Sequence, residues 1–163
     1  MDTYVIREVN DDELDQCADV IRRGFGTVAE DFGLTIENVP TNGAFIKTER
    51  LAADREKGNK MYVLTEKEAI VGFMQLEKAD AQRYYLQKIS VLPECRHRGY
   101  GKKLLQFTDE KVREFGGKKI EIAIIEENEQ LKKWYIQNGF THTSTKKFEH
   151  LPFTVGFMQR DIE

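Results

Sequence analysis

Apolar residues recur at every second position in some stretches of the chain and at helical spacing in others. Two-residue alternation predicts strands over residues 3–9, 61–65, 69–77, 84–92 and 118–125, and a terminal hairpin over 140–147 and 153–162. Helical spacing predicts helices that begin near Asp11, at about Ala44, after Gly101 and at Asn128. We expect a long, partly irregular connection over 26–42, where glycines, a proline and a Thr-Asn-Gly turn signal interrupt the pattern.

The order of these elements predicts a mixed α/β fold. The strands over 61–92 follow one another through short polar turns, which is typical of an antiparallel meander. The strand over 84–92, the helix after Gly101 and the strand over 118–125 form a unit whose strands should be parallel. We therefore expect a single domain over residues 1–163, with a sheet of about seven strands and four or so helices.

Composition narrows the class of protein. The chain has 163 residues, of which 40% are hydrophobic and 33% charged, with a net charge of −3, and this balance argues against general affinity for nucleic acid. No apolar run is long enough to span a bilayer and the first residues lack a signal pattern, so we expect a cytoplasmic protein with no membrane association. The two cysteines and three histidines lack the spacing of a disulfide or a metal site.

Most of the candidate chemistry lies in the loop from Arg96 to Lys103. It follows the strand over 84–92 and Pro93, contains two glycines and four basic residues, and leads into a helix. A helix N-terminus offers unpaired N–H groups and a partial positive charge, so the loop should cradle a phosphate-bearing ligand. The loop is neither a P-loop nor a dinucleotide fingerprint, because one residue separates Gly99 from Gly101 and Leu104 stands where the fingerprint has a third glycine.

Three motifs in order match a known family. They are Arg96-x-x-Gly99-x-Gly101, the preceding Ile89-x-Val91, and Asn128-x-x-Leu131-x-x-x-Tyr135-x-x-x-Gly139-Phe140. Over about residues 60–145 the chain resembles the GNAT (GCN5-related) N-acetyltransferases. The resemblance implies the GNAT fold, acetyl-CoA as co-substrate, no metal, and direct attack of a primary amine on the thioester.

The resemblance also implies roles for individual residues. The backbone N–H groups near Ile89 and Val91 would bind the acetyl oxygen and pantetheine, and Tyr135 would protonate the leaving thiolate. Asn128 has two readings, an N-cap of its helix or a hydrogen-bonding partner of pantetheine. Pyrophosphate would be bound by Arg96, Arg98, Gly99, Gly101 and Lys102, with flanking or backbone contacts from His97, Tyr100 and Lys103.

The general base does not follow from the family pattern. Tyr85 and Ala123 stand where family members place a glutamate. A water chain ordered near Tyr85 is the preferred alternative, and Glu77 and His150 are the others. We expect the acceptor between the segment over 27–32, including Phe32, and the hairpin that contains His150.

The identity of the acceptor is also open at this point. Mild acidity slightly favours a small cationic amine over a protein or peptide amine. A rival hypothesis is a regulatory protein that binds acyl-CoA without catalysis, since no carboxylate occupies the family's base positions. Homodimers are frequent in the family, and the sequence does not decide the oligomeric state.

Overall fold

The computed structural model describes residues 3–163, in which seven strands form one sheet of order β1-β2-β3-β4-β5-β7-β6. The strands are β1 (Tyr4–Glu8), β2 (Lys60–Glu66), β3 (Ala69–Lys78), β4 (Arg83–Val91), β5 (Lys119–Ile125), β6 (Thr141–Lys147) and β7 (Thr154–Asp161). The helices are α1 (Leu14–Asp31), α2 (Thr48–Glu56), α3 (Tyr100–Glu114) and α4 (Glu129–Gln137). Only β4 and β5 pair in parallel, and every other neighbouring pair is antiparallel.

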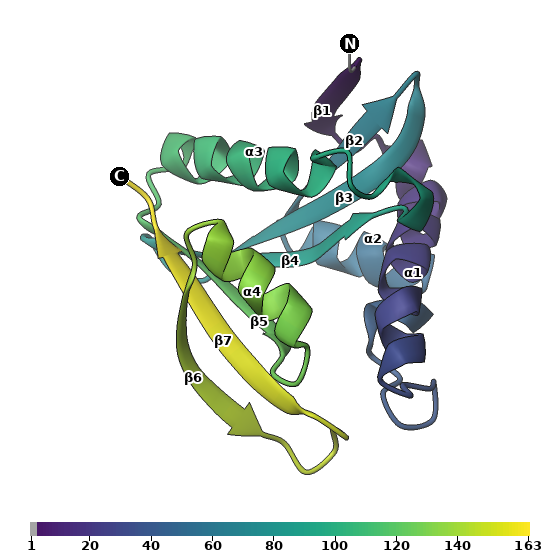
Figure 1. Ribbon diagram of the computed structural model, residues 1–163. Coiled ribbons are helices and arrows are strands. Elements are labelled where there is room, and N and C mark those ends of the chain that lie inside the picture. The colour runs from purple at the N-terminus through teal and green to yellow at the C-terminus, as the bar shows by residue number, and fades with distance from the viewer. Residues whose placement is uncertain (1–2) are drawn as a thin grey trace.

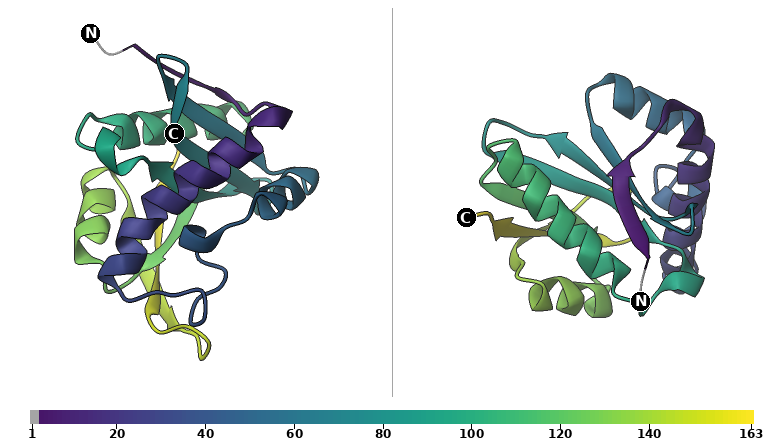
Figure 2. Two further views of the ribbon diagram at one scale, coloured as in Figure 1. Left: turned by 90° about the vertical axis from the view of Figure 1, so that its right-hand side faces the viewer. Right: turned by 90° about the horizontal axis from the view of Figure 1, so that it is seen from above.

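The helices cover the sheet in two layers. Seen along the sheet, α3 and α4 lie on one side and α1 and α2 on the other (Figure 2). The core fills both spaces, and β3 is buried on both faces from Ile70 to Leu76 because helices lie above and below it. The predicted mixed α/β fold is therefore confirmed.

The first helix is longer than the sequence pattern predicts. The expected irregular connection over 26–42 is wrong at its beginning, because α1 continues through two glycines to Asp31. Gly24 is needed for packing: a Cβ atom there would lie 3.0 Å from the Ser90 Cβ and 3.4 Å from the Val91 carbonyl oxygen. The glycine allows α1 to approach β4 closely, and it does not end the helix.

The second helix is shorter than predicted. We expected it to begin at about Ala44, but Gly43–Phe45 form a single 3-10 turn and α2 begins at Thr48. The Asn42 side chain accepts a hydrogen bond from the Ala44 N–H at 2.9 Å and so caps the 3-10 turn. The backbone at Ile46 is then extended, which delays the start of α2.

The terminal hairpin forms as predicted and places β6 at one edge of the sheet, with β1 at the other. In the part of the chain that the structure describes, no helix combines the length and apolarity required to cross a membrane.

The contact at Gly24 gives a testable prediction. Gly24→Leu should destabilise the fold by about 1–3 kcal/mol, because the added side chain has no room between α1 and β4. Gly26→Leu is the matched control, since a Cβ there meets nothing within 4 Å and leucine favours the helix. Thermal unfolding of both variants should show a lower midpoint for the first alone; equal midpoints would contradict the packing role.

Candidate functional site

The central strands β4 and β5 separate after their first three residues. β4 and β5 pair only from Arg83 to Tyr85 and from Lys119 to Glu121. Beyond these residues the two strands diverge, as Figure 1 shows for the part of β4 that runs toward α1. After Tyr85, the backbone N–H and C=O groups on the β5 side of β4 are therefore not paired with β5.

A β-bulge lies within the separated part of β4. Phe73 and Gln75 of β3 pair with Ser90 and Gln87, so β4 contains one more residue than β3 across this interval. Lys88 takes a left-handed backbone conformation with φ 55°. Such a bulge redirects the backbone N–H groups that follow it, which here include those of Ile89 and Val91.

The loop after β4 turns sharply into α3. His97 and Gly99 both have left-handed backbones, with φ 65° and 81°, and Gly99 is the N-cap residue of α3. The first backbone hydrogen bond of the helix runs from the Lys103 N–H to the Gly99 carbonyl at 3.0 Å. Helix geometry leaves the amides of Gly101 and Lys102 without an intrahelical partner, as an anion-binding helix start requires.

The cations of the loop differ in their surroundings. The Arg96 guanidinium donates to the Gly24 carbonyl at 2.8 Å, so this side chain ties the loop to α1. Arg98 forms an ion pair with Glu66 at 2.9 Å and stays about half exposed. Lys102 and Lys103 are exposed on the first turn of α3. Arg98 and the two lysines are therefore more exposed than Arg96, whose expected contact with pyrophosphate stays a prediction.

Glu66 is a residue of this site that sequence reasoning missed. Besides Arg98, its carboxylate accepts a hydrogen bond from the hydroxyl of Tyr100, a buried residue whose ring packs against Tyr4. The hydrogen bonds from Tyr100 and Arg98 hold the pKa of Glu66 below its ordinary value. Glu66 lies at the end of β2, and only the tertiary fold brings it to the loop.

The two loop glycines have different roles. A Cβ at Gly99 would meet nothing within 4 Å, so this glycine serves the left-handed turn and leaves space beside the backbone. A Cβ at Gly101 would lie 3.1 Å from the Trp134 Cζ2 atom, so this residue serves the close approach of α3 to α4. The side-chain position of Gly101 therefore faces Trp134, while its backbone amide belongs to the start of α3 and its contact with a ligand stays a prediction.

Two further predicted residues belong to α4 and its N-cap. The Asn128 side chain accepts a hydrogen bond from the Leu131 N–H at 3.2 Å, so Asn128 is an N-cap. Tyr135 is 4% exposed and packs edge-on against Trp134 and Phe140. Burial raises the pKa of the Tyr135 phenol well above its ordinary value, so the hydroxyl keeps its proton throughout the neutral range.

Two carboxylates flank Tyr85 on the other face of the sheet. Tyr85 pairs with Glu77 of β3 on one side and with Glu121 of β5 on the other, so the three side chains form a row. Glu77 accepts a hydrogen bond from Gln87 at 3.2 Å, and Glu121 pairs with Arg83 at 3.1 Å. Glu121 was not predicted as a site residue. The sequence did carry a signal for its direction, because Glu121 lies between two buried isoleucines of an alternating strand and so points to the face opposite theirs.

The predicted acceptor residues lie at the end of the same face. Phe32 follows α1 and packs against a small cluster that also contacts Leu151 and Phe153 of the terminal hairpin. The segment over 27–32 and the hairpin therefore border one cluster, and the expectation that the acceptor lies between them stays a prediction. His150 is exposed, and its ring packs edge-on against Phe148 at 5.8 Å. The structure brings Phe32 to the hairpin but gives His150 no partner from α1 among the interactions described.

Other groups of the described residues do not form a site. No cluster of three or more histidine, cysteine or acidic side chains within 3–163 could hold a metal. Burial raises the pKa of the Cys95 thiol, so the loop does not activate it.

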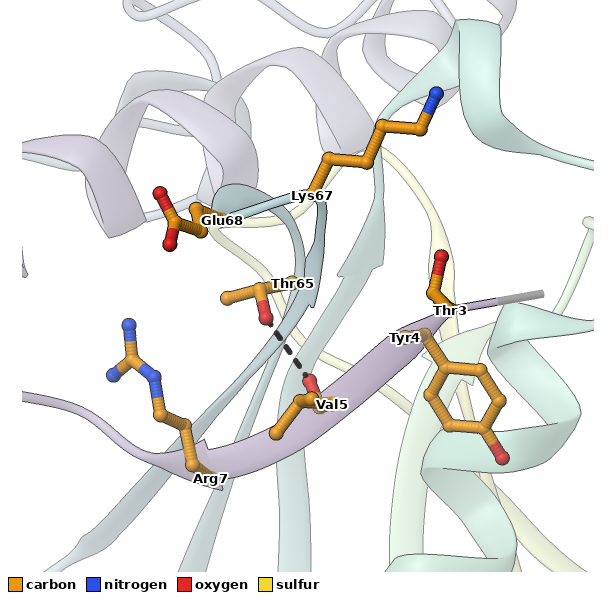
Figure 3. Close-up of a pocket in the computed structure, with 7 residues that line it drawn as sticks. All are labelled: Thr3, Tyr4, Val5, Arg7, Thr65, Lys67 and Glu68. Carbon is orange, nitrogen blue, oxygen red and sulfur yellow. Dashed lines mark hydrogen bonds between the residues drawn. The ribbon is translucent and has the colours of Figure 1, made fainter.

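A shallow hollow beside β1 is lined by Thr3, Tyr4, Val5, Arg7, Thr65, Lys67 and Glu68 (Figure 3). In Figure 3 the Lys67 side chain extends away from Arg7, and the lining groups do not converge on one point.

Comparison with known proteins decides the family. Residues 29–140 match the model of the acetyltransferase (GNAT) family. The chain belongs to the GNAT family. Its motifs from Ile89 to Gly101 lie inside the matched region, as does α4, so the resemblance found in the sequence is confirmed.

This GNAT chain is similar in sequence to a curated protein and similar in fold to solved structures. Over 98 residues it is 30% identical to the uncharacterized N-acetyltransferase in pepI 3'region of Lactobacillus delbrueckii subsp. lactis, a match that covers 56% of this chain and 57% of that relative. The fold resembles the PaiA N-acetyltransferase of Thermoplasma acidophilum in complex with coenzyme A, with TM-score 0.80, 16% identity and 98% and 99% of the two chains covered. It also resembles the ribosomal-protein-S18-alanine N-acetyltransferase of Escherichia coli, with TM-score 0.79, 14% identity and 99% and 95% covered.

The different surroundings of the two glycines predict different effects of substitution. Gly99→Val should weaken coenzyme A binding by about tenfold or more, because the valine disfavours the left-handed turn that aims the amides of the helix start. Gly101→Val should instead displace Trp134, the single tryptophan of the chain, and change its fluorescence without ligand. Titration of both variants by tryptophan fluorescence tests this; an unperturbed Trp134 spectrum in Gly101→Val would contradict the contact.

Proposed function

We propose that this protein is an acetyl-CoA-dependent N-acetyltransferase that transfers the acetyl group directly to a primary amine, with a small cationic amine as acceptor. The observation that carries the proposal is the separation of β4 and β5 beside the cationic start of α3. This separation leaves backbone N–H groups of β4 next to a loop that is suited to binding phosphate. The coenzyme A in the complex of the structurally similar PaiA protein supports the choice of cofactor.

In this proposal the loop binds the pyrophosphate of acetyl-CoA. The amides of Gly101 and Lys102 and the side chains of Arg98, Lys102 and Lys103 would contact the phosphates, with His97 and Gly99 shaping the turn. Arg96 would hold the loop in place through Gly24. The N–H groups of Ile89 and Val91 would then stabilise the thioester oxygen as it gains negative charge.

Tyr135 is the proposed general acid. A thiolate leaving group must gain a proton, and a buried phenol that remains protonated can supply it if the site also desolvates the thiolate. Because Tyr135 lies beside Trp134, which contacts Gly101, the acid is close to the loop in the fold. Asn128 would position α4 as its N-cap.

The acceptor side is the row of Glu77, Tyr85 and Glu121. Two carboxylates beside an aromatic ring suit an ammonium group, which carboxylates attract and an aromatic face also favours. A water near Tyr85 could pass the amine proton to Glu77, which combines two of the alternatives that the sequence left open. Phe32 would close the far end of this face against the hairpin.

The direct test is turnover with a panel of acceptors. Purified protein and acetyl-CoA are incubated with small diamines, uncharged amines and a lysine-containing peptide while free thiol is measured. Turnover greatest with the cationic small amines supports the proposal. Turnover with the peptide alone would identify a protein acetyltransferase, and acetyl-CoA binding without turnover on any amine would favour a regulatory protein.

Tyr135→Phe should lower kcat by about 10²-fold with little change in the Michaelis constant for acetyl-CoA, as loss of a general acid predicts. Because burial raises the Tyr135 pKa, any alkaline decline of kcat between pH 7 and 9 should persist in this variant. Tyr62→Phe is the control, since Tyr62 is equally buried but lies on β2 against Phe107. Wild-type kinetics in Tyr135→Phe would show that Tyr135 only packs in the core and is not the general acid.

Removing the carboxylate of Glu77 and removing that of Glu121 should change different kinetic constants. Glu77→Gln should lower kcat by about 10²-fold, with the greatest loss at low pH where more of the amine is protonated. Glu121→Gln should raise the Michaelis constant for cationic amines by about tenfold and leave that for uncharged amines unchanged. Steady-state kinetics with one amine of each kind distinguish these results, and equal effects on both amines would remove Glu121 from the acceptor site.

A further inference from the structure

A largely buried ion pair joins the bulge of β4 to α2, a helix distant in sequence. Lys88, the bulge residue with φ 55°, places its Nζ atom 3.0 Å from the Asp54 Oδ2 atom of α2. The two side chains are 17% and 4% exposed. Lysine in a left-handed backbone conformation is unfavourable, so the surrounding contacts must hold it there.

Asp54 is also bound by two further donors. Arg50 donates to its Oδ1 atom at 3.2 Å, and the fully buried Gln75 amide donates to Oδ2 at 3.2 Å. Burial opposes ionisation of Asp54, but the bonds from Lys88 and Gln75 outweigh it, so the pKa lies below the ordinary value. The Asp54 carboxylate is therefore the charged centre of a network on the acceptor side of the sheet.

The same network reaches the residue before the bulge. The Gln75 amide donates to the Gln87 Oε1 atom at 2.8 Å as well as to Asp54, so adjacent residues of β4 are connected to one carboxylate. Within the described residues the buried Gln75 Oε1 atom has no hydrogen-bond partner, so this arrangement leaves a polar atom unsatisfied. On the far side of the bulge, the Ser90 hydroxyl donates to the Lys88 carbonyl at 2.9 Å.

Stability alone does not account for this network. A buried ion pair gains little over well-packed apolar side chains, because both charges lose their hydration. Here it also accompanies an unfavourable backbone and an unsatisfied amide oxygen. What the network does fix is one backbone geometry of β4, at the point where the strand has already separated from β5.

We infer that the Asp54–Lys88 ion pair is a positioning device for acetyl transfer, which holds the bulge so that the N–H groups after it face the thioester oxygen. The inference rests on the proposed function for the identity of that oxygen. Neither Asp54 nor Lys88 would contact the reacting atoms. Their effect would be on the backbone of Ile89 and Val91, and so on the acetyl group and not on the pyrophosphate.

The experiment compares two ligands that differ only in the acetyl group. Dissociation constants of acetyl-CoA and CoA are measured by Trp134 fluorescence for wild type, Lys88→Met and Asp54→Asn. We expect the ratio of the acetyl-CoA to the CoA constant to rise about fivefold in both variants, as loss of a hydrogen bond to the carbonyl predicts, while the CoA constant stays within about twofold. In turnover, kcat should fall by about 10²-fold.

Two further variants separate positioning from a general effect on the fold. Lys88→Arg keeps the charge and should retain most of the wild-type ratio and kcat, whereas Lys60→Met removes an exposed lysine of β2 and should change neither. An unchanged ratio in Lys88→Met and Asp54→Asn, or equal weakening of both ligands, would overturn the inference. Wild-type protein that binds both ligands but acetylates no amine would overturn the proposed function alone, because the ligand ratio needs no acceptor.

Discussion

The close approach of α1 to β4 at Gly24 is the contact on which both halves of the site depend. On one side of this residue, Ser90 packs against the helix immediately after the bulge. On the other, the Gly24 carbonyl accepts the hydrogen bond from Arg96 that anchors the cationic loop. A single point of one helix therefore fixes the distance between the strand that would bind the thioester and the loop that would bind the phosphates.

The cations at the start of α3 and the two carboxylates beside Tyr85 lie on opposite sides of the sheet. Arg98, Lys102 and Lys103 surround the start of α3, while Glu77 and Glu121 lie on the opposite face beside Tyr85. An anionic cofactor and a cationic amine would thus be attracted to different faces, and the separated part of β4 lies between them. A net charge of −3 conceals this arrangement, because the whole-chain value sums over both faces.

The sequence predicted features that depend on neighbouring residues and missed those that depend on distant ones. Periodicity located the strands and helices, and the loop over 96–103 was visible because its glycines and cations are contiguous. The continuation of α1 past Gly26 to Asp31 was missed, because a glycine in the sequence is commonly read as a helix end. The packing role of Gly24 was missed because its contact is with Ser90, a residue 66 positions away. Glu121 and the pairing of Asp54 with Lys88 likewise required the strand register and the position of α2.

The bulge itself shows why local pattern was insufficient. The stretch from Tyr84 to Val91 reads as an ordinary strand, and nothing in it marks Lys88 as a residue with a left-handed backbone. Lysine is not a residue that favours this conformation, in contrast to Gly99, eleven residues later. The ion pair that accompanies this geometry joins Lys88 to Asp54 of α2, 34 positions earlier, and no local motif in the sequence marks such a contact.

The hairpin that borders the proposed acceptor face also supplies one open edge of the sheet. β6 is an edge strand of sequence Thr-His-Thr-Ser-Thr-Lys-Lys, and all of its residues except His142 are exposed. Edge strands invite pairing with strands of other molecules, and small polar side chains followed by two lysines make this one a poor template. The sheet can therefore leave an edge open beside its proposed acceptor site without recruiting a second sheet and aggregating.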